Sequence, residues 1–310
     1  MSEVTRRSSF KYILGGVAVM VVGKYRNQLD PLKRIRLGGP VQLPARSPEE
    51  WVRAHQDMDY SAAYCPLQGS DPDVLVQAYA KAAQAADLII AEVGAWSNPL
   101  SPNETERKKA ISKCGQQLDL AERIGAKCCV NISGSRGEQW DGPHPLNFSN
   151  ETFDMIVSVT RAIIDQVKPK RTFFTLETMP WAFPDSVESY VRLLKAVERP
   201  AFAVHFDPVN LICSPQRYYG NAALIREFFR QLGPFIKSCH AKDILLQPKL
   251  TTHLDEVRPG LGGLDYATFL RELSQWPDVP LMLEHLKSEE EYDMAGRHVR
   301  QLADSLHIRI

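Results

Sequence analysis

Four short apolar runs in the second half of the chain each end in a side chain that can bind a metal ion. The four side chains are Glu177, Asp207, His240 and Glu284, spaced 30, 33 and 44 residues apart. A carboxylate at the buried end of a strand is costly unless it is paired or coordinated, and three together would repel one another without a cation. We therefore predict one divalent-metal site at these residues. The alternative is four unrelated surface or ion-paired side chains.

Each interval between these residues fits one strand, one helix and two loops, and the same alternation extends back to about residue 34. We expect strands at 35–43, 61–67, 88–93, 127–133, 172–177, 201–207, 236–243 and 280–285. We expect helices from 47 and at 71–86, 101–124, 150–167, 185–198, 220–232, 265–275 and 288–306. Eight such units predict an α/β fold, a (β/α)8 TIM barrel that forms a single domain over residues 34–310. The Gly-rich phosphate turn of an open doubly wound sheet is missing.

Residues 1–33 are expected to be an extension outside the barrel. The Arg6-Arg7 pair precedes an apolar stretch of about a dozen residues, 12–23, which is short for a membrane span but suits a signal peptide. The paired arginines with a downstream Phe and Lys resemble a twin-arginine export signal. We expect an exported, periplasmic protein. The alternative is a cytoplasmic protein in which this stretch is a buried strand or helix of the domain.

The overall charge argues against a protein that grips nucleic acid. Lys plus Arg and Asp plus Glu number 37 each, so the formal net charge is zero. The six cysteines show no C-x-x-C spacing, and we expect buried, reduced thiols. We expect no nucleic acid as a partner, and a homo-oligomer is an open possibility.

Several polar and aromatic side chains fall in the expected loops at the carboxyl ends of the strands, where barrel active sites lie. The candidate substrate-binding residues are Glu92, Trp96, His144, Trp181, Asn210, Lys242, Asp243 and Arg258. Tryptophans there could stack on a sugar ring or simply cap the barrel. Lys242 and Asp243 could orient His240 or bind hydroxyl groups. The Gly-rich segment 256–263, with Arg258 as its cation, could bind phosphate or be an ordinary turn.

An ordered set of short motifs resembles the xylose isomerase-like TIM-barrel superfamily, in particular its sugar phosphate isomerase/epimerase proteins. The motifs are Leu176-Glu177, Phe206-Asp207-Pro208-Val209-Asn210, Cys239-His240-Ala241-Lys242-Asp243, the segment 259–266 and Leu283-Glu284-His285. The resemblance implies that Glu177, Asp207, His240 and Glu284 bind one Mn, Mg, Co or Zn ion. Ketose epimerases of the family usually carry a His three residues after the metal-binding Asp, where this chain has Asn210. This departure argues against free-ketose specificity.

The expected activity is a metal-dependent sugar isomerase or epimerase of carbohydrate metabolism, with a small carbohydrate as its substrate. Glu177 and Glu284 would move a proton on a carbon next to a carbonyl, through an enediolate. The same chemistry with a leaving group one carbon further on gives a lyase or dehydratase acting on keto-sugars, keto-glycosides or keto-inositols. Two further alternatives are an apurinic-site endonuclease and a sugar-binding barrel without catalysis. An endonuclease would need more metal ligands and a basic rim.

Overall fold

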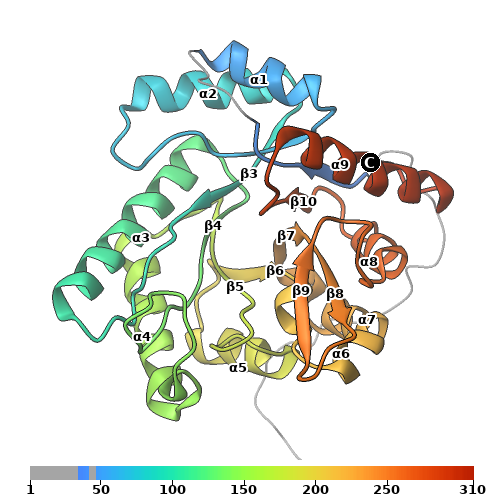
Figure 1. Ribbon diagram of the computed structural model, residues 1–310. Helices are drawn as coiled ribbons and strands as arrows, with labels where there is room; N and C mark the ends of the chain where they lie inside the picture. The colour runs from blue at the N-terminus through green and yellow to red at the C-terminus, as the bar shows by residue number, and fades with distance from the viewer. Residues whose placement is uncertain (1–33, 42–46) are drawn as a thin grey trace, which may run out of the picture. The chain divides into compact units, whose positions relative to one another are not determined.

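The chain folds as a closed parallel barrel surrounded by helices (Figure 1). The computed structural model describes residues 34–41 and 47–310. Within these residues the barrel strands are β1 (Arg36–Gly38), β2 (Ala62–Tyr64), β3 (Ile89–Gly94), β4 (Cys128–Asn131), β5 (Phe173–Glu177), β6 (Phe202–Phe206), β7 (Ile236–Ala241) and β10 (Pro280–Leu283). They close in the order β1-β10-β7-β6-β5-β4-β3-β2, with every pair parallel. The predicted single-domain (β/α)8 TIM barrel is confirmed.

The helices lie on the outside of the barrel and alternate with its strands. They are α1 (Pro48–Asp57), α2 (Asp73–Ala85), α3 (Glu104–Ile124), α4 (Asn150–Val167), α5 (Val187–Val197), α6 (Pro215–Tyr219), α7 (Asn221–Leu232), α8 (Tyr266–Leu273) and α9 (Glu289–Ser305). Their ends follow from local chemistry. The Ser47 hydroxyl accepts a hydrogen bond from the amide of Glu50 at 3.1 Å, and Pro48 follows at the first helical position. At the other end of α3, Gly125 adopts φ +80°, which suits glycine.

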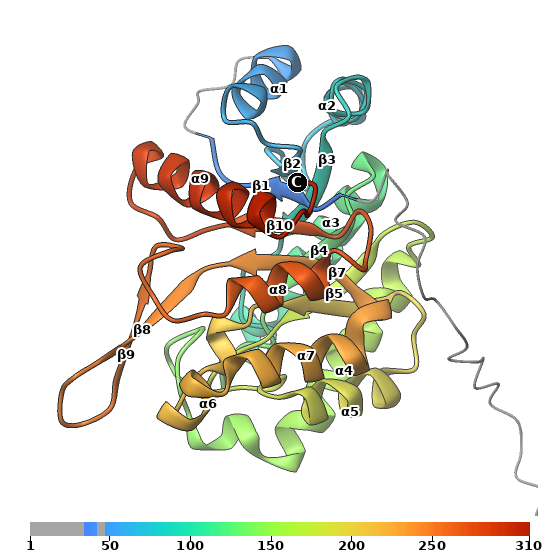
Figure 2. The ribbon, with the colours of Figure 1, turned by 90° about the vertical axis from the view of Figure 1, so that its right-hand side faces the viewer.

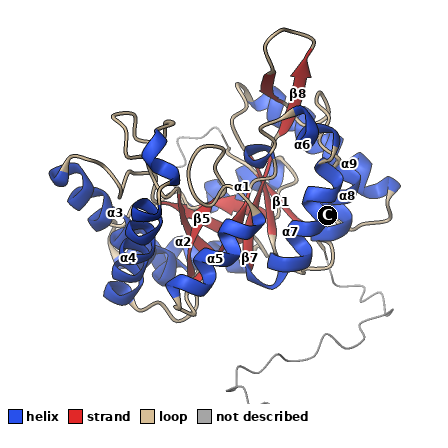
Figure 3. Ribbon diagram, turned by 90° about the horizontal axis from the view of Figure 1, so that it is seen from below, coloured by secondary structure: helices blue, strands red, loops and turns tan. Residues whose placement is uncertain are grey.

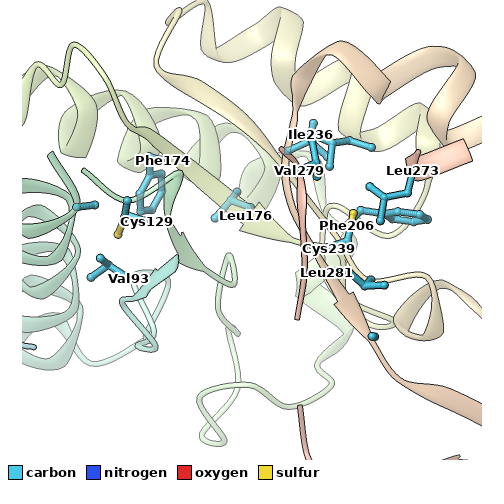
Figure 4. Packing of buried hydrophobic residues seen from close by; sticks show 14 of the residues in the cluster. Val93, Cys129, Phe174, Leu176, Phe206, Ile236, Cys239, Leu273, Val279 and Leu281 are labelled. Atoms are coloured by element: carbon cyan, nitrogen blue, oxygen red, sulfur yellow. The ribbon is translucent and has the colours of Figure 1, made fainter. Parts of the chain in front are cut away.

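The main hydrophobic core lies between the barrel and the helices (Figure 4). Side chains alternate along a strand, so Phe174 and Leu176 of β5 join this core while Glu177 belongs to the opposite set. On β6, the ring of Phe206 stacks on Phe228 of α7 with centroids 3.8 Å apart. This packing fixes the strands whose carboxyl ends carry the site.

The segment after β7 differs from the prediction. A single strand was expected at 236–243, followed by a Gly-rich loop. Instead β7 ends at Ala241, and the chain turns into an antiparallel hairpin of β8 (Asp243–Gln247) and β9 (His253–Val257). The hairpin extends away from the barrel (Figures 2 and 3). The apolar run that follows Asp243 forms the first strand of this hairpin.

Two other expectations have different outcomes. The first strand was expected at 35–43; among the described residues up to 41 it covers Arg36–Gly38, and residues 42 and 43 lie outside the described part. The twin-arginine-like segment lies outside the described residues, so its role in export stays a prediction.

Among the helices of the described part, none is long and apolar enough to span a bilayer. All six cysteines are described and none forms a disulfide, although Cys213 is exposed.

Candidate metal centre

The four predicted ligands meet at the carboxyl ends of neighbouring strands. Glu177 is the last residue of β5, His240 lies near the end of β7, and Asp207 and Glu284 directly follow β6 and β10. The Nδ1 atom of His240 lies 3.0 Å from Glu177 Oε1, 3.8 Å from Asp207 Oδ2 and 2.8 Å from Glu284 Oε1. One ligand atom from each residue lies within 4.8 Å of all the others. The structure therefore brings the four side chains into one group.

The chemistry of this group fits a divalent cation. In the described part of the chain, Asp207 Oδ2 and Glu284 Oε1 are buried without a hydrogen bond of good geometry. Both oxygens belong to the group of ligand atoms, and buried carboxylates at such short range from one another need positive charge among them. Three carboxylates with one imidazole suit Mg²⁺, Mn²⁺ or Zn²⁺. The residues present can therefore hold the metal that was predicted.

Lys242 is a fifth charged group of this centre. Its ammonium lies 2.8 Å from Asp207 Oδ2 and 2.7 Å from Glu284 Oε1, at ion-pair distance. It is also 3.6 Å from Glu256 Oε2 of the hairpin. Burial lowers the pKa of Lys242, but the carboxylates of Asp207 and Glu284 outweigh burial and hold this pKa well above its ordinary value. Lys242 thus balances part of the negative charge.

The two glutamates experience different environments. Burial raises the pKa of Glu177 and outweighs the attraction of His240. Burial also acts on Glu284, but there His240 and Lys242 dominate and lower the pKa to about 2. For His240, burial lowers the pKa, and the surrounding carboxylates, Glu284 foremost, raise it well above the ordinary value. The two glutamates of the centre therefore have pKa values shifted in opposite directions.

Glu92 lies beneath the centre and does not face the cavity, contrary to its predicted role in binding substrate. Its Oε2 atom is 3.4 Å from Nε2 of His240, and its Oε1 atom is 2.9 Å from Nε2 of His205. The hydroxyl of Ser238 donates to Oε1 as well. Metal-binding histidines usually have their second nitrogen anchored in this way. Glu92, and not Lys242 or Asp243, therefore orients His240.

Asp243 serves the loop and not the substrate. Its carboxylate accepts hydrogen bonds from four backbone amides, Ile244 at 2.8 Å and Leu264 at 2.9 Å on Oδ1, and Gly260 and Gly262 at 3.0 Å on Oδ2. A Cβ on Gly262 would lie 2.3 Å from Oδ1, so glycine is required there. The amides of the Gly-rich segment are occupied by this carboxylate, which contradicts the interpretation of the segment as a phosphate site.

A cavity of about 720 Å³ opens above the centre. Glu177, Glu284, Asn210 and Lys242 form its floor and sides. The amide of Asn210 donates to Glu177 Oε1 at 3.2 Å and to the carbonyl of Thr178 at 3.0 Å, so Asn210 positions Glu177. This contact gives the residue that departs from the ketose-epimerase pattern a definite place in the site.

Aromatic side chains form much of the rest of the lining. The predicted Trp96 and Trp181 line the cavity together with Tyr64, Trp140 and Tyr292. Two predicted residues are not part of it. Arg258 donates to the carbonyl of Pro259 at 3.4 Å, and Nδ1 of His144 accepts from the amide of Leu146 at 3.3 Å.

Comparison with known proteins agrees with this fold. The family model described as "Xylose isomerase-like TIM barrel" matches residues 41–304. The chain belongs to the xylose isomerase-like TIM barrel family. No curated protein matches the sequence.

Solved structures of this fold resemble the chain at low identity. The 3-keto-D-glucoside 4-epimerase of E. coli has 12% identity and a TM-score of 0.64, covering 86% of this chain and 100% of its own. The probable 3-DHS dehydratase of Bacillus anthracis has 17% identity and a TM-score of 0.64, covering 87% and 98%. Endonuclease IV of Thermus thermophilus has 12% identity and a TM-score of 0.67, covering 87% and 99%. At these identities the likeness shows the fold alone.

In this xylose isomerase-like barrel, several residues that line the cavity were not predicted from the sequence, among them Tyr64, Glu256 and Tyr292. Tyr64 ends β2, and its place at a strand end was a usable signal. Glu256 lies in β9 of the hairpin that was not predicted. Tyr292 belongs to α9, where a helical pattern gives no indication of a site.

Proposed function

We propose that this protein is a divalent-metal-dependent sugar isomerase or epimerase that moves a proton on a carbon next to a carbonyl. One observation carries the proposal. Glu177 and Glu284 both line the cavity, and both lie within 3.0 Å of the same nitrogen of His240. Two carboxylates around one small volume can remove and return a proton, while Asp207 and His240 complete the metal site.

The positions of Glu177, Glu284 and Asn210 around the cavity suggest a separate role for each. A bound divalent ion would supply Lewis-acid polarisation of the substrate oxygens. Glu177 and Glu284 come from β5 and β10, which β6 and β7 separate in the barrel, so they reach the substrate from different directions. One removes the proton and the other returns it, either to the opposite face or to the neighbouring carbon. Asn210 keeps Glu177 in place through its amide.

β-Elimination by a lyase or dehydratase is the second candidate for this site. Both reactions begin with removal of the same proton. Nucleic acid is a poor partner for this site, because among the described lining residues Lys242 and His285 alone are basic. Product mass separates the two candidates, since epimerisation conserves mass and elimination of water or an alcohol does not.

The first test is metal content, measured by plasma mass spectrometry after loading with Mn²⁺ and desalting. We expect about one equivalent in wild type and a large loss in His240→Ala. His253→Ala, which removes an exposed histidine of the hairpin, is the matched control and should keep its metal. Equal metal in wild type and His240→Ala would overturn the proposed centre.

The second test is exchange of carbon-bound hydrogen with D₂O, followed by mass spectrometry on free ketoses and on methyl 3-keto-glucoside. We expect exchange with at least one of these probes, and its loss in Glu177→Gln and in Glu284→Gln. Glu188→Gln, which changes an exposed glutamate of α5, should exchange normally. Sugar binding without any exchange would indicate a binding protein and contradict the enzymatic proposal.

A further inference from the structure

Three tryptophans occupy one side of the cavity. Trp96, Trp140 and Trp181 follow β3, β4 and β5, which are consecutive in the barrel, and we call them the tryptophan wall. They are 37%, 40% and 36% exposed, so their rings are available to a ligand. Large aromatic side chains left accessible in a cavity are typical of surfaces that stack on flat apolar groups or on sugar rings.

Two members of the tryptophan wall, Trp96 and Trp181, are held in place before any ligand binds. A Cβ on Gly94 would lie 2.5 Å from Nε1 of Trp96, so the indole packs where only glycine leaves room. The indole of Trp181 donates to the carbonyl of Asp141 at 2.5 Å, and the amide of Asn147 donates to the carbonyl of Trp181 at 3.1 Å. A fixed aromatic surface loses little conformational entropy on binding.

The space beside this wall exceeds what one sugar ring needs. The cavity of about 720 Å³ falls in the upper part of the roughly 300–1,000 Å³ range of pockets for drug-sized ligands. A second cavity of about 440 Å³ is also bordered by Trp96 and Trp140. A ligand at the carboxylates can therefore extend along the tryptophan wall toward this second space.

The charge of the lining disfavours a phosphorylated substrate. The main cavity is lined by the carboxylates of Asp141, Glu177, Glu256 and Glu284. Its two basic side chains are already paired with carboxylates: Lys242 with Asp207 and Glu284, and His285 with Glu256 at 3.1 Å. Four carboxylates against one ammonium leave three formal negative charges, and a divalent cation would still leave one. A phosphate group would be repelled, because no cation among the described lining residues is free to receive it.

We propose that the substrate is an uncharged glycoside whose sugar ring carries a ketone, since the proposed proton transfer needs a carbonyl next to the reacting carbon. Its sugar ring lies at Glu177 and Glu284, and its second group, another sugar or an aromatic aglycone, lies against the tryptophan wall. This inference rests on the proposed function of the site as a sugar enzyme, and it adds the class of substrate. It is consistent with Asn210 standing where ketose epimerases carry a histidine.

The test is calorimetric titration of the Mn²⁺-loaded full chain with phenyl β-D-glucoside, phenyl β-D-galactoside and phenyl β-D-mannoside. Each is compared with its parent sugar and with the sugar 6-phosphate. These glycosides carry no ring carbonyl, so binding is measured without turnover. We expect at least one phenyl glycoside to bind tenfold or more tightly than its parent sugar, and the 6-phosphates to bind no better than the parent sugars.

Variants locate the effect. In Trp140→Ala the preference for the phenyl glycoside should fall below threefold, and Trp140→Phe should retain most of it because a ring remains. Trp276→Phe, at the C-terminal end of α8, should match wild type. Absence of any phenyl-glycoside preference, a preference unchanged in Trp140→Ala, or tighter binding of a 6-phosphate would each overturn the inference. A preference for phenyl glycosides without solvent exchange would support the glycoside site and contradict the proton-transfer proposal. Solvent exchange without such a preference would support proton transfer and contradict the glycoside site.

Discussion

Lys242 and Glu284 share an ion pair of 2.7 Å at the oxygen that also lies 2.8 Å from Nδ1 of His240. A permanent cation is thus built into the group of carboxylates that would hold a metal ion. Any divalent ion binding there must share its ligand oxygens with this ammonium. We therefore expect Lys242 to moderate metal affinity, and its charge keeps three buried carboxylates compatible with folding.

The first prediction concerns Lys242→Met. Removal of the ammonium removes its repulsion of a divalent ion, so we expect Mn²⁺ to bind at least tenfold more tightly, by titration followed with electron paramagnetic resonance. The metal-free variant should also unfold at a lower temperature, because its carboxylates lose their counter-charge. Lys237→Met, which removes a lysine near the start of β7, is the control for charge alone. Equal Mn²⁺ affinity in wild type and Lys242→Met would refute this role.

A second prediction follows from the contact between Glu92 and Nε2 of His240. Glu92→Gln should weaken Mn²⁺ binding by about 10–100-fold, as loss of an orienting carboxylate usually does. Glu122→Gln alters a glutamate that binds the backbone amides before β5, at the other end of the strand, and should bind Mn²⁺ normally. If Glu92→Gln stays within threefold of wild type, Glu92 does not orient the ligand.

A third prediction concerns the stability of the loop held by Asp243. Asp243→Asn replaces one of two accepting oxygens with a donor that faces backbone amides. We expect a loss of about 3 kcal/mol in the free energy of unfolding, given roughly 1.5–3 kcal/mol for a hydrogen bond to a charged group. Urea unfolding measures this loss. Asp255→Asn on the exposed face of β9 should change stability by less than about 0.5 kcal/mol, and equal stability of the two variants would contradict the structural role.

A fourth prediction concerns the pH dependence of stability. His55 is buried against Trp51, and its Nδ1 atom lies 2.8 Å from the Trp51 carbonyl. Burial lowers the pKa of His55 and outweighs this hydrogen bond, which raises it. The unfolded chain therefore binds a proton first as the pH falls, so the contribution of His55 is complete above pH 6.5 and is lost below it.

We expect the stability of wild type to fall more steeply than that of His55→Gln between about pH 7.5 and 5.5, by at most about 1.4 kcal/mol per pH unit. Urea unfolding at several pH values gives both curves. His307→Gln, near the C-terminus, should run parallel to wild type. Parallel curves for wild type and His55→Gln would show that His55 does not titrate on unfolding in this range.

The sequence predicted site residues best where the type of side chain and its place at a strand end both indicate a metal ligand. Glu177, Asp207, His240 and Glu284 end strand patterns at regular intervals, and parallel strands of a barrel bring such ends together. Glu92 also ended a strand pattern, but its register turned it below the site, and register within a barrel depends on pairing that no local pattern reports. The place of Glu92 near the end of a strand was predictable, but the side of the metal centre on which its side chain lies was not.

The hairpin shows a different reason for failure. Lys242 separates two short apolar runs, one in β7 and one in β8. A short apolar run is compatible with a barrel strand and with a hairpin strand, so the pattern alone does not distinguish them. Asp243 had the appearance of an active-site carboxylate because it follows His240 and Lys242. Its four backbone donors come from Ile244 and from glycines and a leucine about twenty residues later, and only the folded loop reveals them.

The hairpin leaves the barrel immediately after β7 and returns before α8, and along the way it contributes Glu256 to the rim of the cavity. The rim on this side is thus an inserted module whose attachment points are fixed by Asp243. During divergence, such a module can lengthen, shorten or change its side chains while the strand ends that hold the chemistry stay intact. For an engineer, the same separation makes β8–β9 the segment to exchange between relatives when a new substrate preference is wanted.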